Sequence, residues 1–81
     1  MPITVLFFAS ARDAAGVSEL QIVDIPNTDA LRKHLAQRFP KLAPLVHSTS
    51  ITLAVNEEYV TSNTVLEEND TVALIPPISG G

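Results

Sequence analysis

The sequence comprises 81 residues, carries a net charge of −4 at pH 7 and contains no cysteine. This length predicts one small domain with a single modest core, and the 46% hydrophobic content is typical of a globular chain rather than a disordered one. The lack of cysteine excludes disulfides, thiolate catalysis and cysteine-ligated zinc.

No apolar run approaches the roughly 18 residues that a membrane span requires. The first ten residues, MPITVLFFAS, lack the basic stretch that opens a signal peptide. We therefore expect a cytoplasmic protein.

The charges are distributed unevenly along the chain. The five lysines and arginines all lie at or before Lys41, whereas the segment from residue 42 onward holds five acidic residues and no lysine or arginine. Such a chain lacks the basic footprint that nucleic-acid binding requires. The acidic second half is either a plain solvated face or a surface that meets a basic partner.

The first predicted elements are two strands joined by a loop. The apolar run over residues 2–8, PITVLFF, predicts a strand that is covered on both faces and central in its sheet. Residues 9–16, ASARDAAG, are small and polar and are interpreted as a loop. In residues 18–25 the apolar Leu20 and Ile22 fall on one face, which predicts a second, more exposed strand in a hairpin with the first.

A helix is predicted next. Its start lies at Pro26–Asp29, where Asn27 or Thr28 can serve as the N-cap. Apolar residues then recur at i, i+4 and i+8 and form one buried stripe, consisting of Leu31, Leu35 and Phe39. The side chains expected on the solvent side are Arg32, Lys33, Gln37 and Arg38. Pro40 ends the helix, because a residue that precedes proline avoids the α region.

The second half of the chain predicts further strands. Residues 41–48 form a short turn or 3₁₀ segment that returns apolar side chains to the core. Residues 51–56, ITLAVN, predict a third strand, followed by a turn and a short return strand at residues 59–60. Residues 67–70 predict a tight polar turn, and residues 71–75, TVALI, predict the last strand.

This order of elements fits one compact α+β solution. A mixed sheet of four to five strands packs one face on the single main helix, and the first and last strands, which are the most apolar, lie central, adjacent and parallel. This is the β-grasp, or ubiquitin-like, arrangement. We expect a β-grasp domain over residues 1–75 and an extended C-terminal tail over residues 76–81.

The tail carries the strongest functional signal of the chain. Two of the three glycines are the final residues, Gly80 and Gly81, and the adjacent prolines Pro76 and Pro77 stand before them. Proline favours an extended backbone and glycine has no Cβ atom, so such a tail can thread into a narrow slot of a partner. The ionised carboxylate of Gly81 is a competent nucleophile toward the α-phosphorus of ATP, and the resulting acyl-adenylate would be open to attack by sulfur or by an amine.

Segments from one end of the chain to the other also match a known family. They are Val5-Leu6-Phe7-Phe8-Ala9 with Arg12-Asp13 following, Ala54-Val55-Asn56, Glu68-Asn69-Asp70-Thr71-Val72-Ala73 and Pro76-Pro77-Ile78-Ser79-Gly80-Gly81. In these segments the chain resembles the small subunit of molybdopterin synthase, the sulfur carrier of molybdenum-cofactor biosynthesis. The PPxxGG tail is the most specific segment, and Ile75 stands where the family often has an aromatic residue.

The resemblance implies a non-catalytic sulfur-donor subunit of a sulfurtransferase, with no active site of its own. An E1-like adenylating enzyme would use ATP and Mg²⁺ to adenylate Gly81, and a sulfur donor protein would convert the adenylate to a thiocarboxylate. The charged carrier would then dock on the large subunit of molybdopterin synthase, in a heterotetramer, and give sulfur to cyclic pyranopterin monophosphate. The carrier would hold no metal and no tightly bound cofactor, since the adenylating enzyme uses the ATP in trans.

The resemblance also implies which residues contact these partners. In the tail they are Pro76, Pro77, Ile78, Ser79 and Gly80, and in the domain they are Phe8, Arg12, Tyr59 and Ile75. Phe8 and Ile75 are alternatively simple sheet core. Tyr59, at a strand edge, offers both apolar area and a hydroxyl to a partner. His34 and His47 fall on different predicted elements and are interpreted as ordinary surface or boundary residues.

Three other functions remain open on the same residues. The chain could be a ubiquitin-like protein modifier that is joined to lysines through Gly81. It could be a sulfur carrier of thiamine synthesis or another pathway. It could also be an interaction module whose tail is inert.

Overall fold

The computed structural model describes residues 2–47 and 51–76. These residues form a five-stranded sheet and three helices. The strands are β1 (Ile3–Phe7), β2 (Glu19–Ile22), β3 (Thr52–Val55), β4 (Glu58–Val60) and β5 (Thr71–Ile75). The helices are α1 (Ala9–Ala15), α2 (Thr28–Arg38) and α3 (Ala43–His47).

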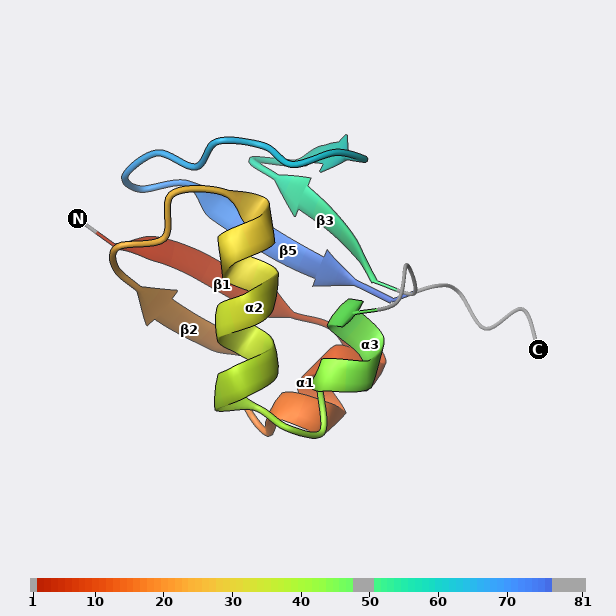
Figure 1. Ribbon diagram of the computed structural model, residues 1–81. Helices are drawn as coiled ribbons and strands as arrows, with labels where there is room; N and C mark the ends of the chain where they lie inside the picture. The colour runs from red at the N-terminus through yellow and green to blue at the C-terminus, as the bar shows by residue number, and fades with distance from the viewer. Residues whose placement is uncertain (1, 48–50, 77–81) are drawn as a thin grey trace.

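The sheet has the strand order β2-β1-β5-β3-β4. The first and last strands, β1 and β5, are parallel neighbours in its interior, and every other pairing is antiparallel. The main helix α2 crosses one face of the sheet (Figure 1). This arrangement confirms the predicted α+β fold of the β-grasp type.

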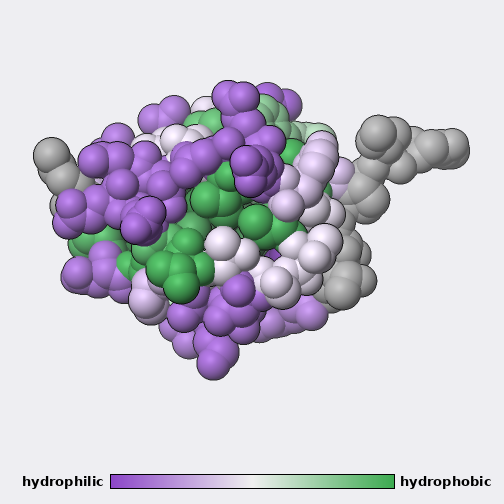
Figure 2. Space-filling model, turned by 90° about the horizontal axis from the view of Figure 1, so that it is seen from above, coloured by the Kyte–Doolittle hydropathy of each residue, from purple (hydrophilic) through white to green (hydrophobic). Residues whose placement is uncertain are grey.

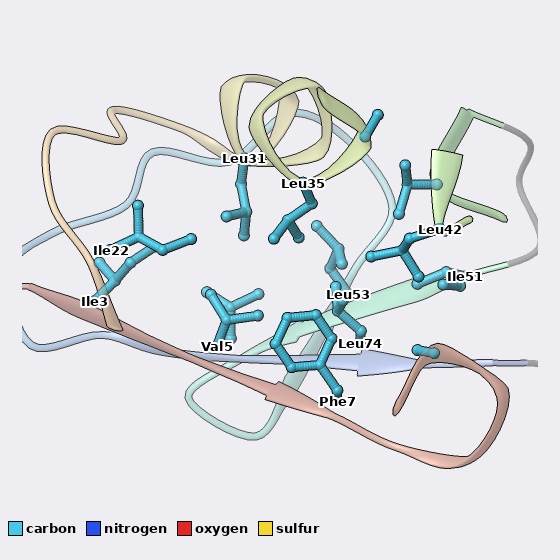
Figure 3. Packing of buried hydrophobic residues seen from close by; sticks show 14 of the residues in the cluster. Ile3, Val5, Phe7, Ile22, Leu31, Leu35, Leu42, Ile51, Leu53 and Leu74 are labelled. Atoms are coloured by element: carbon cyan, nitrogen blue, oxygen red, sulfur yellow. The ribbon is translucent and has the colours of Figure 1, made fainter. Parts of the chain in front are cut away.

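The core lies between α2 and the sheet. Leu31 and Leu35 point from the helix toward Val5 and Phe7 on β1 (Figure 3). All four side chains are at most 2% exposed. Phe39, at the C-cap of α2, meets Phe7 edge to face, with ring centroids 5.7 Å apart. The predicted apolar stripe of the helix is therefore confirmed.

The prediction of a loop over residues 9–16 is wrong, because residues Ala9–Ala15 form helix α1. Alanine is the strongest helix former, and four of the seven residues of α1 are alanines. Gly16 ends the helix in the left-handed region at φ 78°, and its N–H donates to the carbonyl of Arg12 at 2.8 Å. The alanine content and the terminal glycine were thus the signals of a short helix.

The expectation that β1 is covered on both faces is also wrong for the described part of the chain. Ile3, Val5 and Phe7 are buried under the helices, but the alternate side chains Thr4 and Leu6 remain half-buried. The helices lie on one side of the sheet only (Figure 1). The opposite face of the sheet, the open face, is not covered by any helix of the described residues, and the candidate functional site described below lies on it.

The start of α2 is tied to the connection over residues 61–70. Asn27, one of the two predicted caps, is the N-cap, and its side-chain oxygen accepts the N–H of Ala30 at 2.8 Å. Thr28, although polar, is 3% exposed, because its N–H donates to the Thr64 carbonyl and its hydroxyl accepts the Thr64 N–H, both at 2.9 Å. Seen from above, the molecule has hydrophobic residues in the middle of its surface with hydrophilic residues around them (Figure 2).

Arg32 was expected on the solvent side of α2, and the structure corrects this expectation. Its guanidinium donates to the carbonyl of Val46 at 3.1 Å and to the carbonyl of Ile51 at 3.0 Å. Val46 lies in the last turn of α3, where carbonyls lack helical partners and a positive charge is favourable. Arg32 therefore holds α3 and the start of β3 against the main helix.

We predict that Arg32→Met lowers the free energy of unfolding by about 1–3 kcal/mol, because it removes two charge-assisted hydrogen bonds and leaves their carbonyls without this donor. Urea unfolding at neutral pH measures the change. Lys33→Met, at the adjacent exposed position of the same helix, is the matched control and should change stability by less than about 0.5 kcal/mol. Equal losses in the two variants would contradict a structural role of Arg32.

Candidate functional site

A single cross-strand row defines the centre of the open sheet face. Leu6 of β1 lies opposite Ala73 of β5, Ala73 lies opposite Ala54 of β3, and Ala54 lies opposite Tyr59 of β4. Paired residues point to the same face of a sheet, so this row runs across four neighbouring strands. Two methyl side chains thus stand between two large ones.

This row is the middle of a groove on the open face. The alanines form its floor, and larger side chains stand around them. The lining residues are Leu6, Phe8, Ala54, Asn56, Glu57, Tyr59, Thr71, Ala73 and Ile75. Tyr59 is 68% exposed and Phe8 is 48% exposed. Scattered exposed hydrophobic residues need no explanation, but an apolar groove with exposed aromatic side chains is typical of a surface that another protein covers.

The structure brings three of the predicted domain contacts together. Phe8, Tyr59 and Ile75 come from three distant parts of the sequence, and all line the groove. Phe8 is therefore not core, and Ile75 is half-buried at the end of β5. Arg12 is exposed on α1 and does not line the groove.

The floor of the groove is not apparent from the sequence. The sequence predicts strands at Ala54 and Ala73 but does not show that the two alanines lie side by side. Only the register, which pairs them with each other and with Leu6 and Tyr59, places them together. An alanine at the same face in each of two strands of a predicted sheet is the signal that could have found the groove.

The groove lies where the chain leaves the sheet. Strand β5 is paired on both sides, with Leu74 opposite Phe7 and Ile75 opposite Thr52. The next residue, Pro76, is half-buried. The remaining tail contacts, Pro77, Ile78, Ser79, Gly80 and Gly81, lie outside the described residues, so the predicted division into a domain and a tail stays a prediction.

A hydrogen-bonded turn fixes the other end of β5. The Asp70 carboxylate accepts the N–H of Glu67 and the side-chain amide of Asn56, both at 2.8 Å. The Asn56 side-chain oxygen in turn accepts the N–H of Thr71 at 3.0 Å. The bond from the Glu67 N–H, followed by the bond from Asn56, lowers the pKa of Asp70 below its usual value of 3.8. Asn56 and Thr71 are thereby held in place at the edge of the groove.

The described residues contain no group of histidine, cysteine and carboxylate side chains that could hold a metal ion. His34 and His47 lie on α2 and α3, and neither lines the groove. No helix in residues 2–47 and 51–76 has the length and apolar character to cross a membrane. What the described groove offers is apolar area and a few hydrogen-bonding groups beside the origin of the tail.

The ThiS family model matches residues 5–81. The chain belongs to the ThiS family. Curated relatives include the molybdopterin synthase sulfur carrier subunit of Arabidopsis thaliana, which is 39% identical over 98% of this chain and 82% of that protein. The subunit of the same name from Escherichia coli is 35% identical over 98% of this chain and 99% of that protein. The resemblance seen in the sequence is therefore confirmed.

Solved structures of other proteins have the same fold. Subunits 1 and 2 of the molybdopterin-converting factor of Helicobacter pylori form a protein–protein complex, in which the matched chain is 26% identical to this one, with a TM-score of 0.73 and complete coverage of both chains. The small archaeal modifier protein 1 of Methanosarcina acetivorans is 28% identical, with a TM-score of 0.78 over 99% of this chain and 96% of that one.

We predict that Asp70→Asn lowers the free energy of unfolding at neutral pH by about 1 kcal/mol, because an amide accepts through one oxygen only and the turn needs two acceptors. The pKa of Asp70 is lowered on folding, so its contribution is present above pH 3.8 and is lost as the pH falls through the folded value. Urea unfolding of both proteins across the acid range should show their difference shrinking below about pH 4. A difference that does not depend on pH would contradict the role of the ionised carboxylate.

Proposed function

We propose that this chain is the sulfur carrier of molybdopterin synthesis and that Gly81 is the residue on which the sulfur is carried. The observation that carries the proposal is the family match over residues 5–81, which includes the tail through Gly81. Molybdopterin synthase sulfur carrier subunits at 39% and 35% identity support it. The described groove adds a protein-docking surface at the origin of that tail. The two features together suit a donor subunit that is presented to other enzymes.

The chemistry takes place at the terminal carboxylate. Its oxygen attacks the α-phosphorus of ATP on an E1-like adenylating enzyme, so that pyrophosphate leaves and Gly81 becomes an acyl-adenylate. A donor protein then supplies hydrosulfide, whose sulfur attacks the acyl carbon; AMP leaves, the proton is lost, and a thiocarboxylate remains. Adenylation is needed because a free carboxylate carries a negative charge and has no good leaving group. Each thiocarboxylate gives one sulfur to the pterin substrate and returns to the carboxylate, so two charged carriers are needed to convert cyclic pyranopterin monophosphate to the dithiolene of molybdopterin.

The groove is the surface on which the large synthase subunit docks. Phe8, Tyr59 and Ile75 supply the apolar contacts, and the alanine floor of Ala54 and Ala73 receives a side chain of the partner. Since Ile75 ends the strand from which the tail continues, docking here delivers the tail to the same partner. The complex of the two Helicobacter pylori subunits supports such an assembly, in which we expect a heterotetramer.

A ubiquitin-like protein modifier is the second candidate. The likeness to the small archaeal modifier protein 1 of Methanosarcina acetivorans favours it. Both candidates share the acyl-adenylate of Gly81 and differ in the group that attacks it, which is a sulfur nucleophile in one case and a lysine amine in the other. Isopeptide bonds between Gly81 and lysine side chains of other proteins, detected by peptide mass spectrometry of cell extracts, would favour the protein-modifier function over the sulfur-carrier function.

We predict that the protein co-expressed with its adenylating enzyme and sulfur donor carries a thiocarboxylate and is about 16 Da heavier, the mass difference between sulfur and oxygen. Adding one alanine after Gly81 should abolish this gain, because the carboxylate then stands one residue too far along the tail and next to a Cβ atom. Intact-protein mass spectrometry measures it. Gln37→Ala, at an exposed position of α2 outside the groove and the tail, is the control and should still be charged with sulfur, whereas an unchanged mass of the wild-type protein would count against the proposal.

We predict that Ala73→Leu weakens binding of the large subunit at least about tenfold, or 1.4 kcal/mol, because the larger side chain fills the floor of the groove. Isothermal titration calorimetry measures the affinity, and urea unfolding shows that the domain remains folded. Gln21→Leu adds a similar apolar side chain at an exposed position of β2 outside the groove and should leave the affinity unchanged. Equal affinities of wild type and Ala73→Leu would place the docking surface elsewhere.

A further inference from the structure

Strained backbone positions adjoin the groove. Among the described residues, five residues other than glycine have a positive φ, and three of these are asparagine or aspartate, which tolerate the left-handed region. The remaining two are Ala9 at φ 47° and Glu57 at φ 72°. Ala9 directly follows Phe8, and Glu57 itself lines the groove. Strain of this kind gathers at functional surfaces, where the local geometry serves something other than stability.

Glu57 occupies a position at which the fold favours glycine. Val55 pairs with Glu58, so Asn56 and Glu57 form a two-residue hairpin loop, and both have a positive φ, at 50° and 72°. Such a loop is a type I′ turn, for which Asn-Gly is the preferred pair. Asn56 fits the first position and is held by Asp70, but a glutamate at the second position is disfavoured.

Nothing within the described residues compensates for this glutamate. Glu57 is exposed, and its carboxylate makes no hydrogen bond and no ion pair with any described residue. The nearest residues in the sequence are acidic or neutral, since no lysine or arginine occurs after Lys41. Within the part of the chain that the structure describes, the charge at the edge of the groove therefore has no stabilising partner.

We propose that Glu57 is a specificity residue of the docking groove and that its carboxylate pairs with an arginine or lysine of the protein seated there. This inference rests on the proposed function and adds to it the chemistry of the partner. The docked surface presents an apolar side chain to the floor at Ala54 and Ala73 and a basic side chain to the loop at Glu57. Arginine suits the role better than lysine, because its planar guanidinium binds a carboxylate with two hydrogen bonds.

The adjacent glutamate provides a matched control. Glu58 has the same charge and is also exposed, but it lies opposite Val55, which packs against the core side of the sheet, and it does not line the groove. Removing either charge changes the net charge equally, so general electrostatic attraction affects both variants alike. A difference in binding affinity between the Glu57 and Glu58 variants would therefore report a local ion pair at the groove.

The experiment measures binding of the full-length chain to the purified large synthase subunit of the same organism by calorimetry, at low and at high salt. We expect Glu57→Gln to weaken binding about five- to tenfold at low salt, with a smaller loss at high salt, because an ion pair at the rim of an interface is screened. Glu58→Gln should change the affinity less than about twofold. Equal affinities of wild type and Glu57→Gln at both salt concentrations would overturn the inference while leaving the proposed function intact.

A second variant separates strain from charge. Glu57→Gly relieves the strained φ and also removes the carboxylate, so it should raise the urea midpoint of unfolding above that of the wild type while weakening binding as much as Glu57→Gln does. A variant that is more stable and binds as well as the wild type would show that the charge has no role at the interface. Failure of the wild-type chain itself to bind the large subunit would overturn the proposed function and this inference together.

Discussion

The structure depends on the position of β5, which is hydrogen-bonded to β1 on one side and to β3 on the other. A strand held on both sides cannot shift its register without breaking two ladders and turning its buried side chains to the wrong face. Val72 and Leu74 are fully buried under the helices, so Thr71, Ala73 and Ile75 must point to the open face. The same pairing therefore fixes the core, the groove and the place from which the tail continues.

The two faces of the sheet differ in the size of the side chains at their centres. The helix side is filled by large apolar side chains, whereas the centre of the open side has alanines between Leu6 and Tyr59. Larger residues at these two positions would bury more apolar surface in the free domain, so stability alone does not account for their small size. A hollow that the fold leaves unfilled, beside exposed aromatic side chains, is suited to being filled by another protein.

The sequence predicted the fold well, because it depends on patterns that are local. The apolar runs of the strands, the cap at Asn27 or Thr28 and the proline at the end of the helix predict the elements, and the most apolar strands occupy the middle of the sheet. The features it missed depend on register or on long-range contacts. Arg32 looked like a solvent-facing base until its acceptors, the carbonyls of Val46 and Ile51, were brought near by the packing of α3. Helix α1 differs from the prediction for another reason: small and polar residues are typical of loops, but alanine also favours a helix.

Two carboxylates near the groove show how the fold and the interface use charge differently. Asp70 accepts hydrogen bonds from a backbone N–H and from Asn56, and these bonds hold the turn that leads into β5. Glu57 follows that same Asn56 in the sequence, yet it sits in a backbone conformation that opposes it, and its carboxylate has no partner within the described residues. Glycine at this position would relieve the strained φ, so the stability of the free domain does not account for a glutamate here. Its presence beside Tyr59 is therefore best understood as a requirement of the protein that covers the groove.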